Sequence, residues 1–151
     1  MLGKIKYMRN GGNTYGDCSI ISVDNSSFTH SGQVYTDTGK AYVNGTLDPA
    51  VGATVCKYGK SSGYSYGTIL EKNTSVSSTY FDGSTRGITI CTSNKNPQPG
   101  DSGGAVFVKS GPYVKICGIF NGGATSGPAT MFYTPVYYVT SQGFTVKTVT
   151  N

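Results

Sequence analysis

The most specific chemical motif in the chain is Gly100-Asp101-Ser102-Gly103-Gly104, which follows Pro97-Gln98-Pro99. A nucleophilic serine needs a sharp turn that exposes its hydroxyl, backbone N–H groups directed at the oxyanion, and a general base. The glycines supply the first two, because glycine adopts positive φ and leaves neighbouring N–H groups unobstructed. The motif therefore predicts acyl-transfer chemistry at Ser102. The alternative is a glycine-rich hairpin loop in which the aspartate and serine are incidental.

The elements that would position this loop are short strands. Val and Ile together number 21 and Tyr 12, against 3 Leu and 1 Glu, and Gly at 22 suits many tight turns, so the 151-residue chain is expected to be all-β. Nine runs have the composition and spacing of strands in a sandwich or barrel. These are Cys18–Val23, Gln33–Thr36, Ala53–Tyr58, Ser65–Glu71, Val76–Tyr80, Gly87–Cys91, Ala105–Val108, Val114–Phe120 and Thr130–Thr134. A short helix over Val136–Gln142 and a last strand over Phe144–Val149 complete the prediction.

Composition and charge exclude several classes of protein. No apolar run approaches the ~20 residues that span a bilayer, so no membrane partner is expected. The net charge is +5, but only Lys4, Lys6 and Arg9 lie close together, so no nucleic-acid partner is expected either. Neither a Cys-x-x-Cys pair nor a histidine cluster is present, which predicts no metal site and no cofactor.

Several ordered motifs carry a resemblance to a known family. The Ser102 motif resembles the nucleophile segment of chymotrypsin-like serine proteases, and the run from Val51 to Ile69 resembles the second-barrel opening of the bacterial streptogrisin and α-lytic protease group. Phe120-Asn121-Gly122-Gly123 is similar to the strand that binds substrate backbone, and Phe132–Val136 to the closing strand. The resemblance covers about residues 14 to 147. It implies a Greek-key β-barrel fold and peptide-bond hydrolysis, with a polypeptide as the partner.

The resemblance also implies roles for individual residues. Ser102 would be the nucleophile, and the N–H groups of Gly100 and Ser102 would form the oxyanion hole. Asp101 would be buried beneath it and paired with Lys57, because a buried carboxylate needs a countercharge; the alternative is a solvated Lys57. Asp17, just before an apolar run, would orient the catalytic histidine; the alternative is an ordinary turn residue.

The histidine that such a site needs is not at the family's usual place. The single histidine, His30, comes after Asp17, whereas in the family it precedes the aspartate. The sequence is therefore interpreted as a remnant of the first barrel with the linker in residues 1–40, and a complete second barrel in residues 41–151. Three alternatives remain: a piece of a complete protease that needs a first-barrel segment, an inactive homologue that binds peptides, or recruitment of His30. His30 is otherwise a solvated loop residue.

The resemblance gives an approximate view of the substrate pocket. Phe120, Asn121, Gly122 and Gly123 would contact the substrate, although Asn121 departs from the family's usual serine. The two glycines would keep the pocket mouth open, and Met131 at its far wall would favour small or medium apolar side chains; the alternative for Met131 is core packing. No acid lies between Thr92 and Gln98, which disfavours basic substrate side chains.

The four cysteines, Cys18, Cys56, Cys91 and Cys117, allow three complete pairings. Cys91 and Cys117 fall on strands that flank the serine loop and could be close. Buried reduced thiols are an equal alternative to any disulfide bridge. The resemblance implies an extracellular protein, although the first residues do not have the apolar core of a secretory signal.

Overall fold

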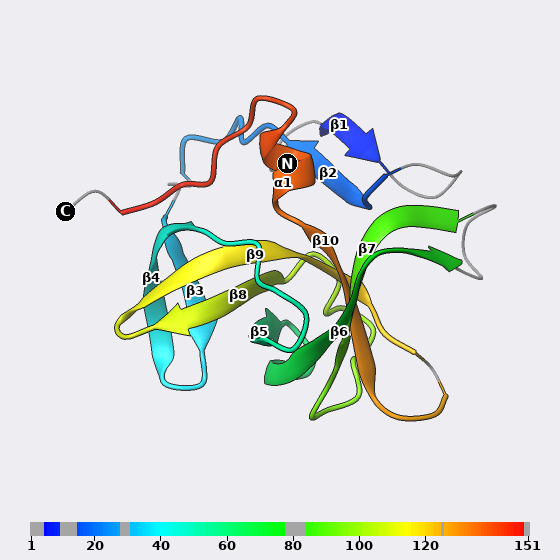
Figure 1. The fold of residues 1–151 in the computed structure, drawn as a ribbon. Helices are drawn as coiled ribbons and strands as arrows, with labels where there is room; N and C mark the ends of the chain where they lie inside the picture. Colours follow the sequence, from blue (N-terminus) through cyan, green and yellow to red (C-terminus); the bar gives the residue numbers. More distant parts are fainter. Residues whose placement is uncertain (1–4, 10–14, 28–30, 78–83, 125, 150–151) are drawn as a thin grey trace.

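The computed structural model describes residues 5–9, 15–27, 31–77, 84–124 and 126–149. These ranges form ten strands and one short helix, so the all-β prediction is confirmed. The elements are β1 (Ile5–Arg9), β2 (Cys18–Ile21), β3 (Gln33–Thr36), β4 (Gly39–Thr46), β5 (Thr54–Gly59), β6 (Gly63–Ser77), β7 (Ser84–Thr92), β8 (Ala105–Ser110), β9 (Tyr113–Gly122), β10 (Thr130–Pro135) and α1 (Tyr137–Thr140) (Figure 1).

Six of these strands close into an antiparallel barrel. Around it the order is β5, β6, β7, β10, β9 and β8, and β8 returns to pair with β5. A closed barrel leaves no unpaired strand edge, so each barrel strand has hydrogen-bonded neighbours on both sides. The loop that carries Ser102 connects β7 to β8 and therefore starts and ends on this closed frame.

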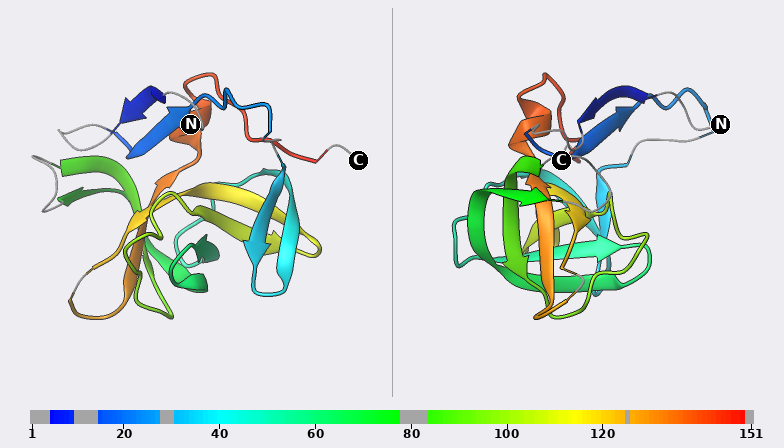
Figure 2. Two further views of the ribbon diagram at one scale, coloured as in Figure 1. Left: turned by 180° about the vertical axis from the view of Figure 1, so that it is seen from behind. Right: turned by 90° about the vertical axis from the view of Figure 1, so that its right-hand side faces the viewer.

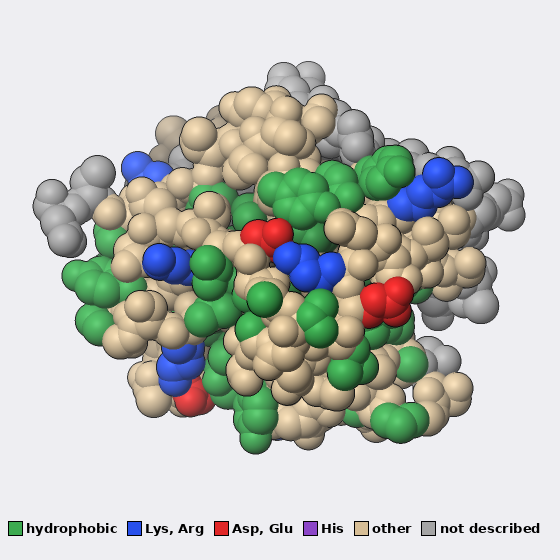
Figure 3. Space-filling model, viewed as in Figure 1, with side chains coloured by type: hydrophobic (Ala, Val, Ile, Leu, Met, Phe, Trp, Pro, Cys, Tyr) green, Lys and Arg blue, Asp and Glu red, His purple; other side chains and the backbone are tan. Residues whose placement is uncertain are grey.

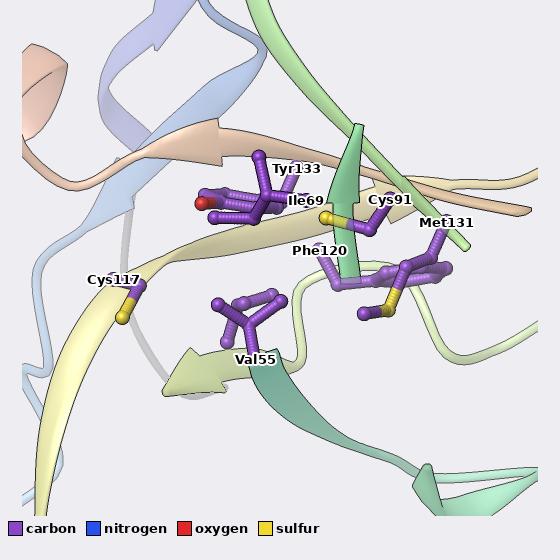
Figure 4. Packing of buried hydrophobic residues seen from close by; sticks show 8 residues of the cluster. Val55, Ile69, Cys91, Cys117, Phe120, Met131 and Tyr133 are labelled. Atoms are coloured by element: carbon purple, nitrogen blue, oxygen red, sulfur yellow. The ribbon is translucent and has the colours of Figure 1, made fainter. Parts of the chain in front are cut away.

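The barrel encloses an apolar cluster to which all six strands contribute. Its members are Val55, Ile69, Cys91, Val106, Cys117, Phe120, Met131 and Tyr133, each at most 1% exposed (Figure 4). Alternate residues of a strand face opposite sides of a sheet, so one face of each barrel strand fills the interior.

A second cluster covers the outside of β5, β8 and β9. Phe107, Val114 and Ile116 pack there with Val43 of β4. β4 runs parallel to β9, and β3 completes a hairpin with β4 across the predicted domain boundary at residue 40. The sequence prediction missed β4, because Val43 is its only buried residue and a half-exposed polar strand has little apolar signal.

The remaining pair of strands lies at one end of the barrel. β1 and β2 form their own antiparallel sheet, which lies beside α1 in both views (Figure 2). The segment just before β2 is fastened to the barrel, because Gly16 N–H donates to the carbonyl of Arg86 on β7 at 2.9 Å.

The predictions for three parts of the chain differ from the structure. The runs predicted as separate strands, Ser65–Glu71 and Val76–Tyr80, belong to the single strand β6 up to Ser77, and residues 78–80 lie outside the described residues. Asn73 (φ 58°) and shifts of register bend β6 where the sequence indicated a break. The helix is shorter than predicted. Residues 144–149 form no strand, although the Val149 N–H donates to the carbonyl of Val43 on β4.

All four cysteines are free and buried. Burial raises the pKa of Cys91 and that of Cys117 to about 12, because the apolar interior disfavours the thiolate. The reduced-thiol alternative therefore describes the protein, and its barrel is held by packing and hydrogen bonds.

Candidate active site

The Ser102 loop makes a sharp turn at the start of β8. Gly100 and Gly103 adopt φ values of 95° and 86°, a region that residues with a side chain rarely occupy. Between them Ser102 is exposed, and its hydroxyl donates to the carbonyl of Asn121 on β9 at 2.9 Å. The turn therefore presents the hydroxyl at the surface, as a nucleophile requires.

The backbone N–H groups of this loop divide into two sets. Those of Asp101, Gly103 and Gly104 donate to the carbonyls of Gln98, Phe120 and Asp101, respectively. Those of Gly100 and Ser102 donate to no acceptor among the described residues. Two unpaired N–H groups beside an exposed hydroxyl are the arrangement that binds the oxygen of a tetrahedral intermediate.

A buried ion pair anchors the loop from below. Lys57 Nζ lies 3.0 Å from Asp101 Oδ2, and both side chains are fully buried. The Ser62 hydroxyl joins the two, since it accepts from Lys57 at 2.8 Å and donates to Asp101 at 2.6 Å. The residues predicted to pair are thus in direct contact, with Ser62 as a third member.

Backbone donors complete the surroundings of Asp101. The N–H groups of Ser61 and Ser62 donate to Oδ1 at 2.9 Å each, and that of Gln98 donates to Oδ2 at 3.0 Å. Desolvation opposes the charge of Asp101, but the hydrogen bonds from Ser62, Gln98 and Lys57 prevail and hold its pKa well below its ordinary value. Asp101 is therefore a fixed anion under the N–H groups of Gly100 and Ser102.

Close packing restricts what can surround this pair. Lys57 Nζ lies 4.8 Å from the centroid of the Phe120 ring, a distance at which a cation is attracted to an aromatic face. A Cβ at Gly59 would overlap the Asp101 carboxylate. Phe120 thus supports Lys57 from the core and Gly59 makes room for the anion.

Asp17 is brought to the same side of the barrel by its backbone. Its N–H donates to Thr134 Oγ1 at 2.8 Å, and its carbonyl accepts from Asn121 Nδ2 at 2.8 Å. Asn121 therefore contacts both predicted catalytic residues: its carbonyl holds the Ser102 hydroxyl and its side chain holds the Asp17 backbone. Burial raises the pKa of the Asp17 carboxyl.

The described residues include no histidine that could act as a general base. His30, the chain's one histidine, lies outside them. The structure therefore brings together Ser102, the two N–H groups and Asp17, and it leaves the base unplaced.

The predicted substrate-contacting residues fall into different environments. Gly122 has open space where a Cβ would be, whereas Gly123 is closely met by Pro97 and Thr130, so only Gly122 is open as predicted. Phe120 and Met131 are almost fully buried in the barrel interior (Figure 4). Met131 therefore packs in the core, which was the alternative to a place at the pocket wall.

Two residues of this site were missed by sequence reasoning. Ser62 falls between the predicted strands Ala53–Tyr58 and Ser65–Glu71, and Thr134 belongs to the predicted closing strand, so neither was given a role. A signal for Ser62 existed, because short hydroxyl side chains next to a glycine turn often bind nearby polar groups. No local signal marks Thr134, since its partner Asp17 is 117 residues away.

Within the described ranges, no group of three or more His, Cys, Asp or Glu residues is placed to hold a metal ion. Nor does any helix there have the length and apolar character to cross a membrane. On the face drawn in Figure 3, the lysine and arginine side chains lie apart from one another.

Comparisons with known proteins identify the family of the chain. Residues 4–141 match the family model described as Trypsin. Streptogrisin-C of Streptomyces griseus is 35% identical over 103 residues, which cover 65% of this chain and 20% of that protein. The chain thus spans about a fifth of the length of this curated relative.

Solved structures extend the likeness to nearly the whole chain. The chymotrypsin of Cellulomonas bogoriensis is 27% identical with a TM-score of 0.80, and the match covers 97% of this chain and 76% of that one. The Nocardiopsis protease NAPase is 28% identical with a TM-score of 0.78, covering 97% and 74%. The predicted chymotrypsin-like fold is confirmed, and the chain belongs to the trypsin family of serine proteases.

Proposed function

We propose that this chain carries the nucleophile, the oxyanion hole and the orienting aspartate of a serine endopeptidase that acts on polypeptides. The exposed Ser102 hydroxyl beside two unpaired N–H groups is the observation that supports it. The buried Asp101–Lys57 pair beneath them supports the same function, because it fixes the loop before any substrate arrives.

The reaction would proceed through an acyl-enzyme. A base removes the Ser102 proton as Oγ attacks the scissile carbonyl carbon, and the carbonyl oxygen becomes an oxyanion that accepts from the N–H groups of Gly100 and Ser102. The C–N bond then breaks while the protonated base gives its proton to the leaving amine. Water, deprotonated by the same base, attacks the ester carbonyl carbon to form a second tetrahedral intermediate. The C–Oγ bond of this intermediate breaks, the protonated base returns its proton to Ser102 Oγ, and the carboxylic acid product leaves.

The base in this proposal is a neutral imidazole oriented by the Asp17 carboxylate. Two sources are consistent with the residues: His30, or a histidine on a first-barrel segment other than these 151 residues. We favour the second, with residues 1–40 as the end of that barrel and its linker, because the family places the histidine ahead of the aspartate. The Ser102 bond to Asn121 would give way when the imidazole approaches.

A second candidate is a homologue that binds peptides without cleaving them. One observation favours it: the Ser102 hydroxyl already donates to a backbone carbonyl, so no base among the described residues activates it. An extended peptide could still hydrogen-bond along Asn121 and Gly122, where the surface beside Gly122 is open.

The first experiment is labelling of the purified chain with a fluorophosphonate, with Ser102→Ala as the control. Labelling that disappears in Ser102→Ala places a base within the chain, and His30→Ala then tests that histidine. Labelling that appears only after a first-barrel segment from a bacterial relative is added supports a base supplied by that segment. No labelling in either case contradicts the endopeptidase and leaves the peptide-binding module.

We infer an extracellular location from the family, and the low charge of the chain, 13% of residues, agrees with it. Cell fractionation of the source organism tests this, and recovery of the protein in the cytoplasm alone would contradict it.

A further inference from the structure

Four tyrosines form a row along the outside of the barrel, from β3 across β5 to β6. Tyr58 and Tyr64 are directly opposite each other in the β5–β6 pair, so their side chains share a face, and both pack on the outer apolar cluster. The centroid of the Tyr35 ring lies 5.5 Å from that of Tyr58. At the other end, the centroids of Tyr64 and Tyr66 are 6.4 Å apart. Tyr35 is 53% and Tyr66 48% exposed, so both ends of this tyrosine row are open to a ligand.

Three exposed lysines lie along the tyrosine row. Lys40 Nζ is 5.7 Å from the centroid of the Tyr35 ring, and Lys109 Nζ is 5.9 Å from that of the Tyr64 ring. Lys95 Nζ donates to the carbonyl of Tyr64 at 2.9 Å. An ammonium group has three N–H donors, so these contacts leave N–H groups for a further acceptor.

Positive charge dominates this surface. Asp37 is the one described acid that forms an ion pair with these lysines, and its Oδ1 lies 2.7 Å from Lys109 Nζ. The other two ion pairs among the described residues involve neither Lys40 nor Lys95. Three lysines against one aspartate give the row a net positive charge, which attracts a negatively charged partner, most strongly at low salt.

The middle of the row is held in place without a ligand. The Tyr64 hydroxyl lies 3.1 Å from Cys56 Sγ, within hydrogen-bond distance, and the Tyr64 carbonyl accepts from Lys95. Lys109, beside the Tyr64 ring, is itself paired with Asp37 from the β3–β4 hairpin. A ligand would therefore meet side chains that are already ordered, which reduces the entropy lost on binding.

The surroundings of the rings favour a peptide over a nucleic acid. Single-stranded nucleic acids stack their bases on open aromatic faces. In this row, each of the two cation–ring contacts places a lysine ammonium over a tyrosine that also has a second tyrosine beside it. The row thus offers ammonium and phenol donors, which suit carboxylates, together with the amphipathic surface of its exposed rings.

We infer that the tyrosine row and its lysines bind an acidic segment of a polypeptide. Its carboxylates would accept from Lys40 and Lys95, and the rings of Tyr35 and Tyr66 would pack against the rest of the segment. An extended peptide of about ten residues spans roughly 33 Å, which is enough to cross the row. The inference does not depend on the function proposed for Ser102, because no member of the row belongs to that site.

The test measures peptide binding to the full chain carrying Ser102→Ala, which prevents cleavage of the probe. Two fluorescein-labelled peptides of about ten residues, one alternating Gly and Glu and the other Gly and Gln, are titrated by fluorescence anisotropy. At about 20 mM salt the Glu peptide is expected to bind at least about tenfold more tightly than the Gln peptide, and the ratio should fall at about 150 mM.

Matched double variants locate the binding surface. Lys40→Gln with Lys95→Gln removes the two cations that have no carboxylate partner, and it should weaken binding of the Glu peptide by at least about tenfold. Lys72→Gln with Arg86→Gln removes two charges from the later part of β6 and from β7, and it should weaken binding by less than about twofold. Equal weakening by the two double variants would overturn the inference, because it would show a general attraction by net charge.

Replacement of the exposed rings tests the rest of the row. Tyr35→Ala with Tyr66→Ala should weaken binding of the Glu peptide about fivefold, and undiminished binding would overturn the inference. Equal binding of the two peptides, or binding of neither, would overturn it as well. So would oligothymidylate that binds more tightly than the Glu peptide and loses this affinity in the Lys40 and Lys95 double variant, since the row would then be a nucleic-acid site. If a variant does not fold, as judged by circular dichroism, the comparison of the two peptides on the parent still decides.

Discussion

The Ser102 loop and the Asp17 segment are the two halves of the proposed site, but the barrel holds them by different means. Beneath the Ser102 loop is a fully buried ion pair, and the Asp101 carboxylate accepts five hydrogen bonds. The Asp17 segment is attached through its backbone to Thr134, Asn121 and Arg86. No described residue donates to the Asp17 carboxylate itself.

The barrel by itself therefore fixes the Ser102 loop, whereas the charge of the Asp17 carboxylate needs a further group to stabilise it. The nucleophile loop has its countercharge and donors inside the barrel. The Asp17 carboxylate has a raised pKa, and in the proposed site it would accept from a histidine. A group that stabilises its charge would complete this half of the site, and the predictions below test each half in turn.

Removal of the buried cation should have the largest effect. Lys57→Met leaves the Asp101 charge without its partner, and the free energy of unfolding is expected to fall by about 3–5 kcal/mol. Urea unfolding followed by circular dichroism measures it. Lys60→Met removes an exposed lysine three residues along and should change stability by less than about 0.5 kcal/mol. Equal effects of the two substitutions would refute the anchoring role of the pair.

The neighbouring serines Ser61 and Ser62 offer a sharper comparison. Ser62→Ala removes the hydroxyl that joins Lys57 to Asp101, so a loss of about 1–3 kcal/mol is expected. Ser61→Ala removes an exposed bond to Pro99 and keeps the backbone bond to Asp101, so its loss should stay below about 1 kcal/mol. Thermal melts of both variants side by side give the order, and a reversed order would contradict the network.

On the other half of the site, Thr134→Val should act locally. It removes the acceptor of the Asp17 N–H, and we expect a loss of about 1–2 kcal/mol together with faster hydrogen exchange at the Asp17 amide. Thr54→Val, an exposed threonine on β5, is the matched control. Unchanged exchange at Asp17 in Thr134→Val would show that the segment is held elsewhere.

The smallest expected effect is a pH dependence of opposite sign at the two aspartates. The lowered pKa of Asp101 gives stability that is present above its ordinary pKa of 3.8 and is lost as pH falls through its folded pKa. The raised pKa of Asp17 gives stability that is full below 3.8 and is lost as pH rises through its folded pKa. Asp17→Asn should therefore be more stable than the native chain at pH 7, by less than about 1 kcal/mol, and equal to it at pH 3.

Urea unfolding of both proteins at the two pH values measures this difference. Asp24→Asn removes the same charge from an exposed position and controls for net charge. If the native chain were more stable than Asp17→Asn at pH 7, some group of the protein would already stabilise the Asp17 charge.

The sequence predicted the features that depend on local composition. The barrel strands with apolar residues were found, because β-branched runs between turn residues carry that signal. The contact between Lys57 and Asp101 followed from family resemblance and the need of a buried carboxylate for a countercharge. β4 was missed because it is mostly polar, and the bulged β6 was divided because Asn73 lies where a turn is expected.

Local sequence patterns could not predict the contacts between segments that are far apart in the sequence. The bond of Thr134 to Asp17, the double use of Asn121 and the contact of Pro97 with Gly123 all depend on how the barrel closes. Gly123 was expected to open the pocket mouth, but the proline ring that meets it comes from a loop whose path the sequence did not indicate.

The buried thiols of the barrel interior give the protein a built-in reporter of its own opening. Burial raises the pKa of Cys91 and that of Cys117 to about 12, so both thiols stay protonated at pH 7, and alkylating reagents react with the thiolate. Modification in the native state is therefore expected to wait for the strands to separate. Mass spectrometry of alkylated protein over time would then measure how often the barrel opens, without any introduced probe.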